Sequence, residues 1–368
     1  MRNPLRRQRK PIFVFGGLAA VVALAGAALF AWWNTNVFGA EALCNGMVAS
    51  EDVQSAHNSR GRMAEVNNQM AAASSEFRCT VKRTSRFIGT DDLEVVVRTA
   101  TESRAFPFTT ATWKNPSAMS YFKDGASGAV SDKRGWVILP KACWSQVGSI
   151  QGSRRIPPSP NAVAVVEAVV EQGSADREGL ARLLVHAAQK VAAGAGCSAT
   201  ELKAPSDLSA LSKPRRTDNQ NACGLRGFSL PKNSLVKGLV EPGQEQLTDK
   251  LSHTWACDMY LNGTSGAQVS FSASSDANIV DGVLRDSDSF QNLGGNRGVA
   301  RADEAVLHCD GGDVYFSARW NTEYDGVLLG LAEYKPDAYV EIQKTTFQKF
   351  LDSAADSRSC PHVTLPSR

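Results

Sequence analysis

Eight cysteines divide this chain of 368 residues into two similar halves. They are Cys44, Cys79, Cys143 and Cys197, followed by Cys223, Cys257, Cys309 and Cys360. The gaps between them are 35, 64 and 54 residues in the first quartet and 34, 52 and 51 in the second. We interpret the quartets as two copies of one cysteine-bearing domain, covering residues 44–197 and 223–368.

An even number of cysteines in an exported chain predicts disulfide bonds, because that compartment is oxidising. Four cysteines in a domain allow three pairings, and the sequence alone does not select one. The similar spacing favours, as a hypothesis, pairing the first cysteine with the second and the third with the fourth. Its four disulfides are Cys44–Cys79, Cys143–Cys197, Cys223–Cys257 and Cys309–Cys360.

Metal and redox motifs need closer cysteines than this chain has. The nearest two in the sequence, Cys197 and Cys223, are 26 residues apart. Zinc sites and redox-active pairs usually contain Cys-x-x-Cys. We therefore expect no metal site and no cofactor.

Segment 12–33 is a run of 22 residues without a charge. A helix rises about 1.5 Å per residue, so this run spans about 33 Å, enough for a hydrocarbon core of about 30 Å. Trp32 and Trp33 end it, where amphipathic rings favour the headgroup level. The segment predicts a single transmembrane helix in the lipid bilayer. Five cations precede it: Arg2, Arg6, Arg7, Arg9 and Lys10.

These cations place residues 1–11 in the cytoplasm and everything after Trp33 outside the plasma membrane. A cleaved signal peptide is an alternative, with Ala40-Glu41-Ala42 as a small-x-small site, but its apolar region usually runs about 7–15 residues. A lipid-modified Cys44 fits less well, since an acid and a leucine stand directly before it. A buried core helix fits poorly beside so many arginines.

Charge distribution argues against a nucleic-acid partner. The formal net charge is +3, and the basic N-terminus supplies five of the positive charges. The remainder then has 35 basic and 37 acidic residues, a net charge of −2. A near-neutral body lacks the basic surface that binds phosphates.

Strand and helix patterns recur in the same order in both halves. Runs of strands without regular βαβ alternation predict an α+β fold with antiparallel sheets. The first half shows strands near 77–81, 93–101, 118–122, 136–139 and 163–170, and helices at 50–57 and 176–193. The second half shows strands near 255–260, 267–273, 305–309 and 314–320, and helices at 234–240 and 337–355. We expect residues 34–43 to form a tether and residues 198–222, with Pro205 and Pro214, a linker.

No arrangement of residues indicates catalysis. No two histidines are spaced as His-x-x-x-His. His308 stands beside Cys309, but a cysteine cannot act as a nucleophile once it is oxidised. Segments 125–128 and 263–266 depart from Gly-x-Ser-x-Gly and indicate turns. Segments 286–288 and 310–313 do not continue into a calcium loop. Tryptophans beside cysteines indicate core packing, and Trp113 is the better candidate for an exposed ring.

In its architecture the whole chain resembles the alanine-rich, single-pass envelope proteins of actinobacteria that carry paired-cysteine domains outside the cell. That resemblance implies a location and no catalytic residues. We expect a membrane-tethered extracytoplasmic binding protein without catalytic activity. The alternatives are a divergent envelope hydrolase, whose site is assembled from scattered residues, and a purely structural envelope protein.

Overall fold

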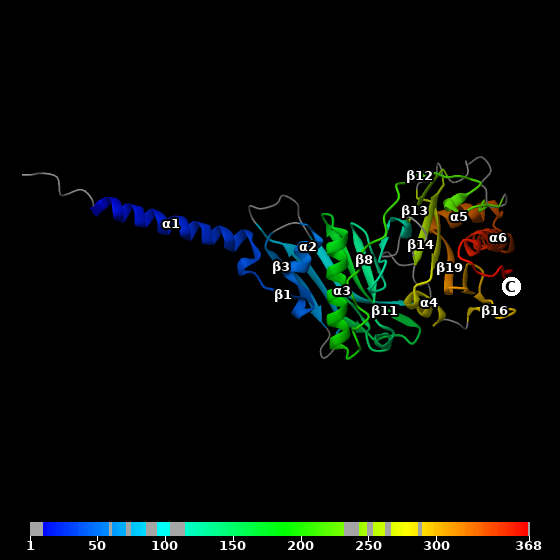
Figure 1. The fold of residues 1–368 in the computed structure, drawn as a ribbon, viewed down its shortest axis with the longest axis horizontal. Coiled ribbons are helices and arrows are strands. Elements are labelled where there is room, and N and C mark those ends of the chain that lie inside the picture. The colour runs from blue at the N-terminus through cyan, green and yellow to red at the C-terminus, as the bar shows by residue number, and fades with distance from the viewer. Residues whose placement is uncertain are drawn as a thin grey trace, which may run out of the picture.

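The computed structural model combines two antiparallel sheets with helices at their faces (Figure 1). It describes residues 10–58, 61–70, 75–85, 94–103, 115–231, 243–248, 253–261, 266–285 and 289–366, with side chains of the first helix from residue 19 on. The predicted α+β class is confirmed. Val-rich strands such as Ala162–Gln172 alternate their side chains between two faces, and an apolar face requires a cover of other apolar side chains.

Helix α1 (Lys10–Asn34) extends away from one end of the body, and the C-terminus lies at the other end (Figure 1). Its 25 residues include the predicted segment 12–33. Within the residues whose side chains the structure describes, no helix has both the length and the apolar character needed to cross a membrane.

The first half contains a sheet of seven strands in the order β3-β4-β5-β11-β8-β7-β6. These strands are β3 (Met63–Met70), β4 (Phe77–Arg83), β5 (Glu94–Ser103), β6 (Ser120–Tyr121), β7 (Gly128–Val130), β8 (Arg134–Ile138) and β11 (Ala162–Gln172). Two small hairpins accompany it, β1 (Ala42–Leu43) with β2 (Val48–Ala49) and β9 (Ser149–Gln151) with β10 (Arg154–Ile156). The helices are α2 (Ser50–Ala56) and α3 (Arg177–Gly194), and Asp176 caps α3 by accepting from the Gly179 N–H.

The second half contains a sheet of eight strands in the order β12-β13-β14-β15-β19-β18-β17-β16. These strands are β12 (Arg215–Arg216), β13 (Gln244–Leu247), β14 (Thr254–Tyr260), β15 (Gln268–Ser274), β16 (Gln291–Leu293), β17 (Gly298–Ala300), β18 (Glu304–Cys309) and β19 (Gly312–Trp320). The helices are α4 (Ala277–Leu284), α5 (Thr322–Leu331) and α6 (Pro336–Asp356). The helix predicted at 234–240 lies outside the described residues.

The two sheets follow the same path apart from the additional edge strand β12. The run from β3 through β4, β5, β11, β8 and β7 to β6 has the counterpart β13, β14, β15, β19, β18, β17 and β16. The long helices α3 and α6 each lie near the C-terminal end of their half, and each buries apolar side chains in the core of that half.

All eight cysteines are paired in four disulfides, and the prediction of disulfide bonds is confirmed. The pairs are Cys44–Cys79, Cys143–Cys197, Cys223–Cys257 and Cys309–Cys360. Each closes a loop within its own half. By the chain-entropy estimate, loops of this size each contribute on the order of 4 kcal/mol, less any strain.

The second sheet buries both of its faces, and this joins the two halves. On β14, Trp255 and Cys257 point into the core shared with α6. Ala256, between them, points the other way and belongs to the core of the first half. Helix α4 adds Ile279 and Val283 to the same core. The apolar cores of the two halves therefore meet in a packed interface rather than across a free linker.

Asp258 anchors the polar part of this interface. It lies on β14 two residues beyond Ala256 and is fully buried. Its carboxylate accepts hydrogen bonds from the Ser117 N–H at 3.0 Å, the Ser117 hydroxyl at 2.5 Å and the Ser270 hydroxyl at 2.5 Å. Burial raises the pKa of Asp258, and these hydrogen bonds oppose the shift.

The segments expected to act as a tether and a linker are bonded to the body. Ser50 N–H donates to the Glu41 carbonyl, and β1 pairs with β2, so the chain ahead of Cys44 is part of the first half. Residues 198–222 run along both sheets. Leu208 forms a bridge with Phe122, and Leu211 forms one with Thr248. We predicted a tether and a linker because these segments are polar or contain prolines. Composition does not reveal backbone pairing with distant strands.

We expect Asp258→Ala to lower the free energy of unfolding by about 2–3 kcal/mol, because the buried Ser117 and Ser270 groups lose their acceptor. Asp258→Asn keeps one oxygen and should cost less than about 1 kcal/mol. Urea unfolding measures both. Equal losses for the two variants would contradict a role for Asp258 as the acceptor at this interface.

Candidate functional site

A cleft of about 640 Å³ lies in the second half, between the β17–β18 turn and α6. Its walls carry hydroxyl, amide, guanidinium, ammonium and carboxylate groups, with few apolar side chains. The lining residues are Ser289, Gln291, Arg301, Ala302, Asp303, Asp337, Val340, Glu341, Lys344 and Pro366. Figure 1 places α6 and β16 at the end of the body opposite α1.

Four charged side chains form a network beside the cleft, and two of them, Arg301 and Asp303, line it. Arg319, on β19, pairs with both Asp303 and Glu304. Arg301 pairs with Glu304 and lies 3.7 Å from Asp303, measured from Nε to Oδ1. The Glu304 side chain is only 1% exposed. The Tyr315 hydroxyl also donates to Glu304, at 2.8 Å.

Burial governs the electrostatics of this network. Burial lowers the pKa of Arg319, and the negative charge of Asp303 opposes that shift. Burial also raises the pKa of Asp325, on the neighbouring α5, where Tyr339 donates to its carboxylate at 2.7 Å. Buried charges are costly unless they are paired. Glu304 is buried while its network partners stay partly exposed, and a paired charge cluster of this kind beside a cleft marks a candidate binding site.

The cleft does not contain the parts of a nucleophilic active site. Ser289 is its hydroxyl-bearing residue, and the Arg301 guanidinium donates to that hydroxyl at 3.2 Å. No histidine lies among the lining residues that the structure describes. An activated serine needs an adjacent general base. The lining can bind polar groups, with one guanidinium and one ammonium as donors and three carboxylates as acceptors.

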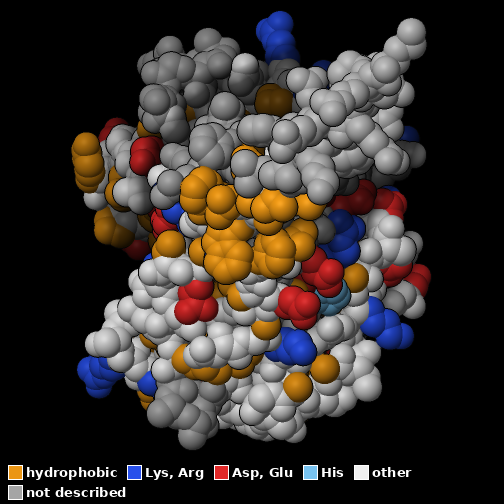
Figure 2. Space-filling model, turned by 90° about the vertical axis from the view of Figure 1, so that its left-hand side faces the viewer, with side chains coloured by type: hydrophobic (Ala, Val, Ile, Leu, Met, Phe, Trp, Pro, Cys, Tyr) orange, Lys and Arg blue, Asp and Glu red, His pale blue; other side chains and the backbone are white. Residues whose placement is uncertain are grey.

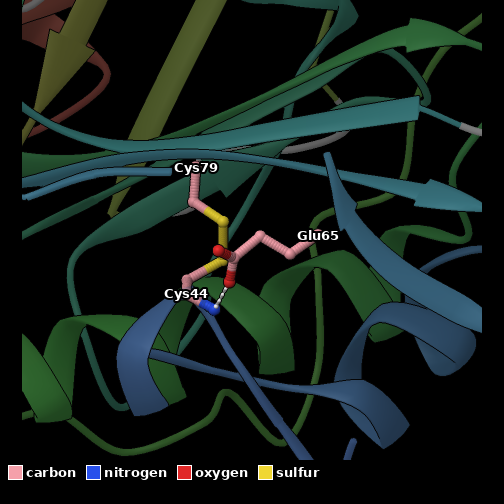
Figure 3. Close-up of side chains that lie close together, drawn as sticks. All are labelled: Cys44, Glu65 and Cys79. Carbon is pink, nitrogen blue, oxygen red and sulfur yellow. Dashed lines mark hydrogen bonds between the residues drawn. A yellow bond between two sulfur atoms is a disulfide. The ribbon is translucent and has the colours of Figure 1, made fainter. Parts of the chain in front are cut away.

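Two further clusters combine a disulfide with a glutamate. In the first half, the Glu65 carboxylate accepts from the Cys44 N–H at 2.6 Å beside the Cys44–Cys79 bond (Figure 3). In the second half, Glu245 accepts from the Cys223 N–H at 2.8 Å. Cys44 and Cys223 both have positive φ, at 56° and 60°.

Among the described residues, these are the two places where three potential metal ligands converge within 4.8 Å. Their cysteines are oxidised, so no thiolate is free to bind a metal ion. The carboxylates instead satisfy backbone N–H groups that the turn would otherwise leave unpaired. The sequence patterns did not indicate a role for either glutamate. The sequence feature that could have indicated them is their similar spacing, 21 and 22 residues after Cys44 and Cys223.

The histidines are dispersed over the described surface. His186 contacts both oxygens of Asp52 at 2.9 Å, with its side chain 47% exposed. His308 contacts Asp313, and His362 contacts Asp356. His253 Nδ1 lies 3.2 Å from the exposed Ser275 hydroxyl, which also bonds the His253 carbonyl.

Several motifs considered in the sequence have structural roles. The Ser127 hydroxyl, in segment 125–128, contacts Asp276 at 2.8 Å and Asn278 at 2.9 Å across the interface between the halves. Trp144 is buried and donates to the Leu139 carbonyl. The Arg285 guanidinium, from the second half, lies 5.2 Å from the Trp144 ring centre. Trp113 and segments 262–265 and 286–288 lie outside the described residues.

Comparisons with known proteins identify no relative of this chain. No family model, no curated protein and no solved structure matches it. The function must therefore be argued from the residues themselves.

The two glutamates differ in burial, which allows a matched comparison. The Glu245 side chain is fully buried and also pairs with Arg215, whereas Glu65 is exposed. We expect Glu245→Gln to lower the free energy of unfolding by about 2–3 kcal/mol and Glu65→Gln by less than about 1 kcal/mol. Urea unfolding of the two variants checks this. Equal losses would show that burial does not determine the strength of the contact.

His57, directly after α2, should make the stability of the protein depend on pH. Burial, followed by the charge of Arg83, lowers its pKa from 6.5 to about 4, and the Ser174 backbone acts in the opposite direction. The unfolded chain therefore binds a proton at higher pH than the folded chain. The contribution of this histidine is complete above about pH 6.5 and is lost as the pH falls towards about 4.

We expect a loss on the order of 2 kcal/mol from this group. His57→Gln should remove that part of the pH dependence, while the exposed His362→Gln should not. Urea unfolding at about pH 7 and about pH 4.5 measures the difference. Parallel pH profiles of the wild type and His57→Gln would refute the assignment.

Proposed function

We propose that this protein is a membrane-tethered extracytoplasmic binding protein without catalytic activity, with its ligand site in the cleft of the second half. Segment 12–33 would span the plasma membrane, with the N-terminus in the cytoplasm. The uncharged run and the cations before it support that orientation. Four disulfides support an oxidising location for the body.

We further propose that the body arose by duplication, with residues 44–197 and 223–368 as the two domains. The shared strand order supports this. So does the repeated contact from a glutamate to the first cysteine of each half. In both contacts the cysteine has a left-handed conformation, which is uncommon outside glycine, asparagine and aspartate, so its recurrence is specific.

The buried charge network carries the binding proposal. A network of two arginines and two acids is weak evidence for stability, because desolvation offsets much of the attraction. Its position beside the cleft, which Arg301 and Asp303 line, favours a role in recognition. The cleft also lies at the end opposite α1, where a tethered protein would meet ligands away from the bilayer (Figure 1).

The charges of the cleft suggest the chemistry of the ligand. Arg301 and Lys344 supply two positive charges, and Asp303, Asp337 and Glu341 supply three negative ones, a net charge of −1 for the lining. Ser289 and Gln291 add neutral donors and acceptors. A ligand with hydroxyl and amide groups and a free ammonium would satisfy these partners. A muropeptide, a disaccharide carrying a short peptide, is a suitable probe from the cell wall.

Calorimetric titration of the purified full-length chain with a muropeptide tests this proposal. We expect saturable binding that Lys344→Gln or Glu341→Gln weakens at least about fivefold, because each removes a charge-assisted hydrogen bond. Lys349→Gln, in the same helix but outside the cleft, is the matched control and should change the affinity less than about twofold.

Failure to saturate, or equal affinity in all variants, would refute the cleft as the muropeptide site. Conversion of the muropeptide by the wild-type protein, detected by mass spectrometry, would instead support the divergent hydrolase.

A further inference from the structure

Exposed hydrophobic side chains gather where α1 joins the first half. Apart from α1, the large exposed hydrophobics among the described residues are Val37, Phe38, Val66 and Tyr334. Val37 and Phe38 are 76% and 51% exposed, and they follow Trp32 and Trp33, which are 49% and 40% exposed. We refer to these four neighbouring side chains, at positions 32, 33, 37 and 38, as the collar.

The collar lies at the end of the molecule from which α1 projects. Figure 2 looks at that end and shows hydrophobic side chains gathered at its centre, with acidic and basic side chains beside them. Trp32 and Phe38 contact each other, with ring centres 5.7 Å apart. The collar is therefore a continuation of the exposed apolar surface of α1, which includes Leu29 and Phe30.

A hydrogen bond connects the turn that carries the collar to strand β3. Thr35, directly after α1, donates to the Ala31 carbonyl at 2.8 Å and caps the turn Asn36–Phe38 by accepting from the Val37 N–H. Asn36 accepts from the Met63 N–H at 3.4 Å. These bonds connect the end of α1 to the turn, and the turn to β3.

Arg62, the residue before β3, adds a second connection between α1 and the first half. Its guanidinium donates to the Trp32 carbonyl at 2.9 Å and lies 5.3 Å from the centre of the Trp32 ring. A long cationic side chain beside aromatic rings suits the boundary between acyl chains and headgroups, where its charged end can reach lipid phosphates.

We propose that the collar inserts into the headgroup layer of the bilayer and holds the first half against the membrane surface in one orientation. This rests on the proposed function, because it requires α1 to be the membrane anchor. Trp32, Trp33 and Phe38 would lie at the interface, and Arg62 would contact anionic lipid headgroups. The second half, with its cleft, would then be held away from the membrane instead of moving freely on a tether.

The test uses the full-length chain in vesicles of phosphatidylcholine and phosphatidylglycerol. An environment-sensitive fluorescent amino acid replaces Phe38 in one protein and Tyr334, which is 79% exposed, in the control. Flotation of the vesicles after an alkaline wash reports anchoring. Quenching by lipids that carry a nitroxide near the headgroup reports the depth of the labelled residue. We expect at least about twofold stronger quenching at position 38 than at position 334.

The two readouts separate this inference from the proposed function. Flotation with equal quenching at the two positions would overturn the docking of the collar and leave the anchor intact. Loss of flotation would overturn the anchor, and the collar with it. Flotation with selective quenching at position 38 would support both.

Discussion

The burial of both faces of the second sheet is the constraint on which the rest of the structure depends. Side chains on β14 alternate, so Trp255 and Cys257 serve the core under α6 while Ala256 and Asp258 meet the first half. A shift of one residue in the register would exchange these sets and place a carboxylate in an apolar core. The halves therefore cannot separate without exposing both the Asp258 contacts and the apolar side chains of α4.

Because the two halves pack against each other, the cleft and the collar belong to one body. Both are built at opposite ends of one packed body (Figure 1). The charge network around Arg319 and Glu304 keeps ionised groups out of water at one end. The collar leaves aromatic rings in contact with solvent at the other. Each arrangement carries a free-energy cost in an isolated soluble protein, and each would be relieved by a partner of the appropriate chemistry, a polar ligand or a lipid surface.

In the two clusters of a glutamate with a disulfide, potential metal ligands converge because the carboxylate accepts a backbone hydrogen bond. Glu65 lies beside Cys44 and Cys79 because the left-handed Cys44 directs its N–H towards the edge strand, where a carboxylate accepts it (Figure 3). The same arrangement at Glu245 and Cys223 has an additional partner, Arg215. A buried polar group requires a hydrogen bond, and that requirement explains the carboxylate without an ion.

Much of the fold could be predicted from local pattern, because alternation and helical periodicity are properties of short segments. The strands around Cys79 and Cys257 and the helices α3 and α6 are examples, and the four disulfides join the pairs that the spacing favoured. Tertiary structure alone decided the rest. Residues 34–43 and 198–222 look like connectors because their composition is polar and rich in small residues or proline, yet backbone pairing with distant strands holds them in place. The cleft brings Arg301 and Lys344 together from separate elements, and a sequence does not record which distant charges lie side by side in the fold.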